Sequence, residues 1–209
     1  MTSATHLYDL LESHWETFGE GFAAVWSEGI SVKETALRLG ADINSAAERT
    51  FADIALGFEG DDMPGDDEGI ILVGNLDRWT LTLQIQWADV AEIDRLLALS
   101  RDGGRAIAVS WHSDSDHLVE CAKDGKLVFS GPMEDALDPL REYSAGLRMP
   151  TDWDIPASQG EPTEEMITTA FVAIGRMVGR EIDDAWLRTP HVRYLIRRTG
   201  KNASAVPWR

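Results

Sequence analysis

Apolar and polar side chains alternate between Trp79 and Trp87, and this pattern constrains the fold more than any other feature of the sequence. Successive side chains of a β-strand point to opposite faces of the sheet, so every second residue shares a face. The apolar face carries Trp79, Leu81, Leu83, Ile85 and Trp87. The polar face carries Thr80, Thr82, Gln84 and Gln86. The pattern predicts a strand of an antiparallel sheet whose apolar face is buried.

Further strand signals lie on both sides of this segment. Ile70–Val73 is an unbroken apolar run, which is typical of a strand buried on both faces. Arg105–His112 also predicts a strand, and one of its faces carries small residues that let another element pack closely. Asp124-Gly125 favours a tight turn that joins strands at 118–122 and 126–129.

Helical signals dominate the N-terminal part of the chain. Apolar residues recur at three- and four-residue steps from Leu7 to Val25, and this spacing predicts one face of a helix. Gly19 and Gly21 weaken its middle, so a break or bend is expected there. Ser31 and Glu34 form a capping box for a short helix that ends at Gly40. Another helix is expected within Ala46–Leu56.

Helices are also expected after the alternating strand. Asp89 is predicted to cap a helix that turns Ile93, Leu96 and Leu97 inward, and a bent helix is expected over 134–143.

At the C-terminal end, Thr163 is predicted to cap a helix that ends at Gly179. Asp183 or Asp184 opens a short helix, and Thr189-Pro190 is expected to start another. Strands in a meander with helices at both ends indicate an α+β fold with an antiparallel sheet and a C-terminal helical pair.

Composition along the chain suggests three parts. Residues 1–148 form the predicted α+β core, 149–162 a linker, and 163–209 a C-terminal helical segment that packs on the core. From residue 188 onward the chain has no acidic residue, and its cations are Arg188, Arg193, Arg197, Arg198, Lys201 and Arg209. Two interpretations stay open for this basic tail: it docks on the acidic body, or it binds a separate anion.

The chain as a whole is strongly acidic, with 36 Asp and Glu against 19 Lys and Arg and a formal net charge of −17. Such an excess repels nucleic acids and anionic membranes and attracts basic proteins. The loop at 57–69 carries the densest group of acids, which we take as candidate partner-binding residues: Asp61, Asp62, Asp66, Asp67 and Glu68. No segment has the pattern of a signal peptide or a membrane span, so the sequence predicts a soluble cytoplasmic protein.

Motifs that commit a chain to one chemistry are missing from the sequence. It has neither a phosphate-binding glycine loop nor a nucleophile elbow, so it predicts no catalytic residue and no cofactor. The single cysteine, Cys121, lies in an apolar run, which favours a buried hydrophobe over a reactive thiol.

One segment has the residue types of a metal site. Its candidate ligands for Zn²⁺ or Mn²⁺ are His112, Asp114, Asp116 and His117. The segment also lies between two predicted strands, where Ser and Asp form solvated turns. We favour the turn and predict no bound metal.

The order of features resembles an uncharacterised actinobacterial domain-of-unknown-function family. The resemblance rests on Leu37–Ala41, Trp79–Leu81, Trp111, Asp124–Val128 and the 137–147 segment, and it covers roughly two thirds of the chain. These are caps, turns and tryptophans, and the resemblance implies an acidic α+β domain without an assigned activity.

Two hypotheses of function follow. The first is a non-enzymatic cytoplasmic binding protein, in one form an immunity-type protein that masks a basic toxin or effector. The second is an enzyme or small-ligand-binding protein whose site is assembled from residues distant in sequence. The oligomeric state is left open.

Overall fold

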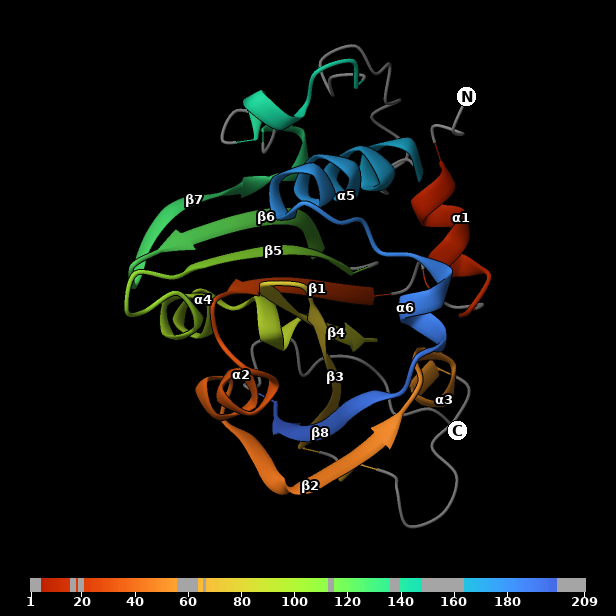
Figure 1. The fold of residues 1–209 in the computed structure, drawn as a ribbon, viewed down its shortest axis with the longest axis vertical. Helices are drawn as coiled ribbons and strands as arrows, with labels where there is room; N and C mark the ends of the chain where they lie inside the picture. The colour runs from red at the N-terminus through yellow and green to blue at the C-terminus, as the bar shows by residue number, and fades with distance from the viewer. Residues whose placement is uncertain are drawn as a thin grey trace.

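The computed structural model describes residues 5–15, 18, 21–55, 64–65, 67–112, 115–135, 140–147 and 164–198. They form one eight-stranded antiparallel sheet with helices on both faces (Figure 1). The predicted α+β class and the antiparallel sheet are confirmed. Within the described residues, no helix combines the length and the apolar character that crossing a membrane requires.

The sheet order is β2-β8-β3-β4-β1-β5-β6-β7, so β2 and β7 are the edges of the described sheet. The strands are β1 (Gly21–Glu28), β2 (Ala41–Arg49), β3 (Glu68–Leu76), β4 (Trp79–Ile85), β5 (Arg105–His112), β6 (Ser115–Lys123), β7 (Lys126–Pro132) and β8 (His191–Arg197). The α-helices are α1 (His6–Glu12), α2 (Val32–Arg38), α3 (Phe51–Ala55), α4 (Ile93–Leu99), α5 (Glu164–Val178) and α6 (Asp184–Arg188). Short 3-10 helices are η2 (Asp89–Ala91), η3 (Met133–Asp135) and η4 (Arg141–Tyr143).

The alternating strand of the sequence is β4, which lies in the interior of the sheet between β3 and β1. Leu83 pairs with Leu72 on one side and with Ala24 on the other, and it is fully buried. The predicted apolar face is therefore confirmed as buried from Trp79 to Ile85, whereas Trp87 lies beyond the strand and is half-buried. Thr80, Thr82 and Gln84 are buried as well, because helices also cover the second face of the sheet.

Helices divide the core into two layers, one on each face of the sheet (Figure 1). Residues of α1, α3, α5 and α6 belong to the larger layer, which is rich in aromatic side chains. Phe18 lies at its centre, with its ring 4.8 Å from that of Trp111 and 5.0 Å from that of Phe22. Residues of α2, η2 and α4 belong to the smaller layer, where Leu96 and Leu99 pack against small side chains such as Ala106.

The predicted helix from Leu7 to Val25 is wrong beyond Glu12. Gly21–Glu28 is the strand β1, which pairs with β4 and β5. The run Phe22–Trp26 is apolar at every position and buried on both faces, as expected for an interior strand. A continuous apolar run contains residues at helical spacing as well as residues at strand spacing. The periodicity therefore did not distinguish a helix from a strand. Within Ala46–Leu56, only Phe51–Ala55 is helical, and the residues up to Arg49 belong to β2.

The predicted helix after Thr189-Pro190 is also wrong, since His191–Arg197 forms β8 between β2 and β3. Tyr194 and Ile196 are buried in the smaller core layer, with the alternation of a strand. The C-terminal segment therefore contributes both helices and an interior strand. Ile93, which was expected to face inward, is 40% exposed. Of the bent helix expected over 134–143, the described residues form only η3 and η4.

Several local signals are confirmed by the structure. Ser31 Oγ accepts a hydrogen bond from the Glu34 backbone N–H, so the capping box opens α2 as predicted. Asp124 and Gly125 both have positive φ, of 50° and 68°, and form the turn between β6 and β7. Asp183 caps α6 through a 2.7 Å bond from the Trp186 backbone N–H. The predicted linker 149–162 lies outside the described residues.

Candidate functional site

The described part of the acidic loop lies beside the basic end of the chain. Glu68 begins β3 and pairs with Arg197, and the carbonyl oxygen of Asp67 accepts a 2.8 Å hydrogen bond from the Arg198 N–H. The other acidic candidates, Asp61, Asp62 and Asp66, lie outside the described residues. Folding therefore brings the acidic and the basic features of the sequence together at one end of β3 and β8.

The side chain of Arg198 lies against an aromatic ring. Its guanidinium carbon is 3.4 Å from the centroid of the Trp87 ring, which is the geometry of a cation–π contact. Trp87 follows the end of β4, where a positive φ of 66° at Gln86 ends the strand alternation. The turn thus places the half-buried indole of Trp87 beside the end of β8.

A third arginine joins this group from α4. Nη2 of Arg95 donates a 2.7 Å hydrogen bond to the carbonyl oxygen of Arg197. Burial lowers the pKa of Arg95, while the nearby carboxylates of Asp89 and Glu92 act in the opposite direction. Arg95 therefore ties α4 to the end of β8 and is surrounded by acids of η2 and the start of α4.

Asp89 is fixed by buried hydrogen bonds. Its carboxylate accepts a 3.0 Å bond from Gln84 Nε2, and Gln84 Oε1 accepts a 2.9 Å bond from the Val90 N–H. Asp89 is only 4% exposed. The two bonds lock η2 onto β4, so the carboxylate has a defined position.

Gly69 allows these groups to approach one another. A Cβ atom at this position would lie 3.0 Å from Gln84 Nε2 and 3.8 Å from Arg198 Cγ. A side chain here would thus compete for the space between the buried amide and the arginine. We call the group formed by Asp67, Trp87, Asp89, Arg95 and Arg198 the sheet-end cluster.

The sheet-end cluster can hold guanidinium groups. The indole face of Trp87 attracts the Arg198 guanidinium, and the adjacent carbonyl oxygen of Arg197 accepts an N–H group of the Arg95 guanidinium. Sequence reasoning identified Asp67 and the basic tail but missed Trp87, Asp89 and Arg95. Trp87 was counted with the apolar face of β4, and Asp89 was assigned to a helix cap. No spacing in the sequence signals that they meet.

Two other basic residues of the tail, Arg188 and Arg193, have side-chain partners in the folded body. The Arg193 side chain is 5% exposed and donates a 3.2 Å bond to the Ser45 carbonyl oxygen. Arg188 forms a 2.6 Å ion pair with Asp184, one turn earlier on α6. Lys201 and Arg209 lie outside the described residues. As far as Arg198, the basic tail is therefore part of the folded body.

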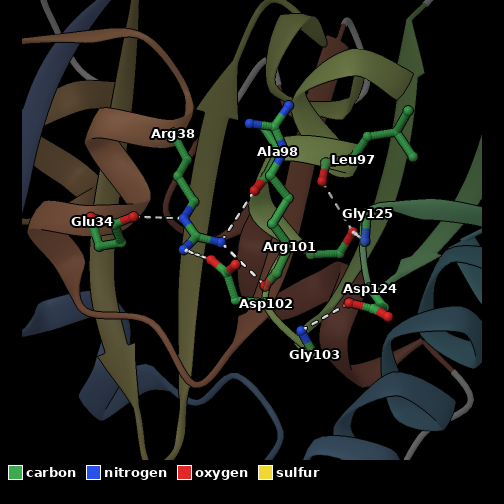
Figure 2. A network of polar contacts seen from close by, with 10 residues as sticks. Glu34, Arg38, Leu97, Ala98, Arg101, Asp102, Gly103, Asp124 and Gly125 are labelled. Carbon is green, nitrogen blue, oxygen red and sulfur yellow. Dashed lines mark hydrogen bonds and ion pairs between the residues drawn. The ribbon is translucent and has the colours of Figure 1, made fainter.

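A second charged network joins α2 to the C-terminal end of α4 (Figure 2). Arg38 donates from Nε to Glu34 over 2.6 Å and from Nη2 to Asp102 over 2.8 Å. Its Nη1 donates to the carbonyl oxygens of Ala98 and Arg101, both over 3.3 Å. Ala98 lies in the last turn of α4, where carbonyl oxygens lack partners within the helix, and Arg101 follows the end of the helix. Arg38 thus closes the end of α4.

The same network fixes the turn between β6 and β7 (Figure 2). The Gly125 N–H donates to the Ser100 carbonyl oxygen over 3.1 Å, and the Gly103 N–H donates to Asp124 over 3.1 Å. The Asp124 N–H donates to the Gly104 carbonyl oxygen over 2.9 Å. The start of β7 is therefore held against the residues that follow α4.

The candidate metal segment lies at the β5–β6 hairpin. His112 ends β5 and pairs with Ser115, and Asp116 and His117 follow in β6. Asp114 and the side chains of the other three candidates lie outside the described part, so the absence of a metal stays a prediction. In the part that is described, no three His, Cys, Asp or Glu residues form a group able to hold a metal ion.

Two groups on β6 have shifted pKa values. Burial raises the pKa of Cys121 to about 11, so the thiol stays protonated at neutral pH and the prediction of a structural cysteine is favoured. Burial also raises the pKa of Glu120, which is 5% exposed and accepts a 2.9 Å bond from Ser130 Oγ. The like charge of Glu92 acts in the same direction.

Comparison with protein-family models, curated proteins and solved structures found no match for this chain. The resemblance to an actinobacterial family therefore stays a prediction.

Proposed function

We propose that this chain is a non-enzymatic binding protein for a basic protein partner, and that the sheet-end cluster receives an arginine side chain of that partner. One observation carries the proposal: the Arg198 guanidinium lies 3.4 Å from the Trp87 ring, and its backbone is bonded to Asp67. The protein's own arginine occupies the position that a partner's arginine would take.

The charge of the whole chain supports the same partner class. A net charge of −17 produces a long-range field that attracts cationic proteins and raises their association rate. The acidic residues Asp61, Asp62 and Asp66 precede Asp67 in the sequence. An immunity-type role, in which the chain masks a basic toxin or effector, is one form of this function.

A titration with short peptides tests the proposal. An arginine-rich peptide is expected to bind more tightly than a lysine peptide of equal charge, because the planar guanidinium stacks on an indole and donates several hydrogen bonds. Affinity should fall as salt increases. Equal affinity for the two peptides at every salt concentration would indicate charge attraction without a site.

Variants locate the binding. Trp87→Leu should weaken the binding of the arginine peptide several-fold, whereas Arg198→Ala should strengthen it because the ring face becomes accessible. The double variant Asp67→Asn with Glu68→Gln should also weaken binding. Its matched control is Asp9→Asn with Glu12→Gln on α1, which removes the same charge at a distant place. If the control pair weakens binding as much as the pair at 67 and 68, the cluster is not the site.

The second candidate function is a small-ligand site assembled from residues distant in sequence. It is favoured by one observation, the buried carboxyl of Glu120 with a raised pKa near Glu92, since perturbed ionisable groups gather at functional sites. Small cationic amines are the probes that match these acids. Binding of such an amine that is lost in Glu120→Gln and kept in Trp87→Leu would favour this candidate over the first.

A further inference from the structure

We propose that β7 is a self-association edge, where a second copy of this chain pairs antiparallel to β7 about a two-fold axis. In the described sheet, β7 is an outer strand whose partner is β6. β7 forms one edge of the sheet, and β8 lies next to the other edge, β2. The β7 edge is therefore separate from the sheet-end cluster. An isologous contact of this kind uses the same patch on both copies, which is the commonest symmetry of protein dimers.

Exposed apolar side chains mark this edge. Among the described residues, the large hydrophobic side chains that are exposed are Leu37, Ile93, Leu127 and Val128, and the last two are adjacent on β7. Val128 is 63% exposed and Leu127 is 42% exposed. Leu127 pairs with Ala122, which belongs to the core layer of α4, so its side chain lies on the α4 side of the sheet.

The charges along β7 complement those of a second copy. Lys126 lies at the start of the strand, opposite Lys123 at the end of β6, and Asp135 follows the end of β7. In an antiparallel pair, the basic start of each β7 lies near the acidic end of the other. Two molecules with a net charge of −17 repel each other overall, and the opposite charges at the two ends of β7 reduce this repulsion at the proposed contact.

Preorganisation further favours β7 as a docking strand. The β6–β7 turn is fixed through Ser100, Gly103 and Gly104, as Figure 2 shows for the contacts of Gly103 and Gly125. An edge strand that is already ordered loses little conformational entropy when a partner pairs with it.

The opposite edge, β2, lacks such exposed apolar side chains among its described residues. β2 alternates between half-buried and exposed residues, and none of its described side chains is a large exposed hydrophobe. Its register with β8 shifts between Asp42 and Ala47. Within this stretch the Leu195 N–H donates its hydrogen bond to Ser45 Oγ and not to a backbone carbonyl oxygen. Both edges have an irregular register, so the exposed apolar pair Leu127 and Val128 is what distinguishes β7. Self-association is therefore assigned to β7.

The edge also carries features that limit its affinity. Val128 is the extra residue of a bulge opposite Cys121 and Ala122, and Pro132 lacks an N–H group. One short strand and a few apolar side chains form a small interface. We therefore expect a weak, reversible dimer with a dissociation constant on the order of tens of micromolar.

Sedimentation velocity of the full chain tests the proposal over a range from low micromolar to about 500 µM. A reversible monomer–dimer equilibrium is expected. Val128→Lys should abolish it, because each copy would place a charge at the apolar contact, and the exposed position keeps the fold intact. Leu37→Lys on α2 is the matched control and should leave the dimer unchanged. A monomer at all concentrations overturns the proposal, as does a dimer that persists in Val128→Lys.

A charge exchange then tests the two-fold arrangement. Lys126→Glu should weaken the dimer several-fold, and adding Asp135→Lys to the same chain should restore it, because each new acid faces a new base on the other copy. If the double variant is weaker than Lys126→Glu, the antiparallel arrangement is wrong. Trp87→Leu should leave the dimer unchanged, so failure of the proposed function and failure of this inference are distinguishable.

Discussion

Replacing Gly74 with alanine tests how β8 is inserted between β2 and β3. A Cβ atom at Gly74 would lie 2.7 Å from Cγ of His191 and closer still to Nδ1, which is too short for a stable contact. The imidazole cannot move freely, since it stacks on Trp186 with ring centroids 4.0 Å apart and forms a 2.8 Å hydrogen bond with the Trp186 carbonyl oxygen. The added methyl group must therefore break this arrangement.

The expected cost combines two effects. Overpacking of a filled site costs about 1–3 kcal/mol. Loss of the His191 hydrogen bond adds about 1 kcal/mol. Gly74→Ala should therefore lower the free energy of unfolding by about 2–4 kcal/mol, measured by urea denaturation with tryptophan fluorescence.

A double-mutant cycle identifies the cause. In a His191→Ala background the clash is gone, so Gly74→Ala should cost much less than it does in the natural chain, with a coupling of at least ~1 kcal/mol. If the two substitutions are additive, or if Gly74→Ala alone costs less than about 0.5 kcal/mol, the contact between Gly74 and His191 is not as described.

Three further predictions concern stability. Leu83→Ala should cost about 2–5 kcal/mol in denaturant unfolding, because Leu83 is fully buried at the centre of the sheet; a cost near zero would contradict its register. Burial lowers the pKa of His191 in the folded state. The contribution of His191 to stability is therefore complete above its unfolded pKa near 6.5 and is lost as the pH falls through its lower folded pKa. The free energy of unfolding of His191→Asn should depend less on pH in that range. Burial raises the pKa of Glu120, so Glu120→Gln should stabilise the protein at neutral pH, with a gain that disappears below the unfolded pKa near 4.5.

Local patterns predicted the elements whose structure is decided locally. The alternation of β4, the capping box of Ser31 and the Asp124-Gly125 turn each depend on a few neighbouring residues. β1 and β8 were missed because their conformation is decided by strands distant in sequence. Phe22–Trp26 is extended because β4 and β5 flank it, and β8 fills the space between β2 and β3.

The candidate site follows the same rule. Charge density in the sequence identified Asp67 and Glu68 together with the basic tail, and the structure places them side by side. Trp87, Asp89 and Arg95 carry no local signature of binding. Their meeting depends on a positive φ at Gln86, on the absence of a side chain at Gly69 and on the insertion of β8.

The most direct test of whether the sheet-end cluster receives a partner's arginine is to follow the NMR resonance of the Trp87 indole N–H. The Trp87→Phe variant assigns this resonance. The measurement is a titration of the Arg198→Ala protein with an arginine-rich peptide, followed by NMR. We predict a saturable shift of this resonance that is several-fold weaker with a lysine peptide of equal charge, and weaker in the natural chain, where Arg198 covers the ring. A Trp87 resonance that stays unchanged while the peptide binds would place the arginine elsewhere and contradict the account.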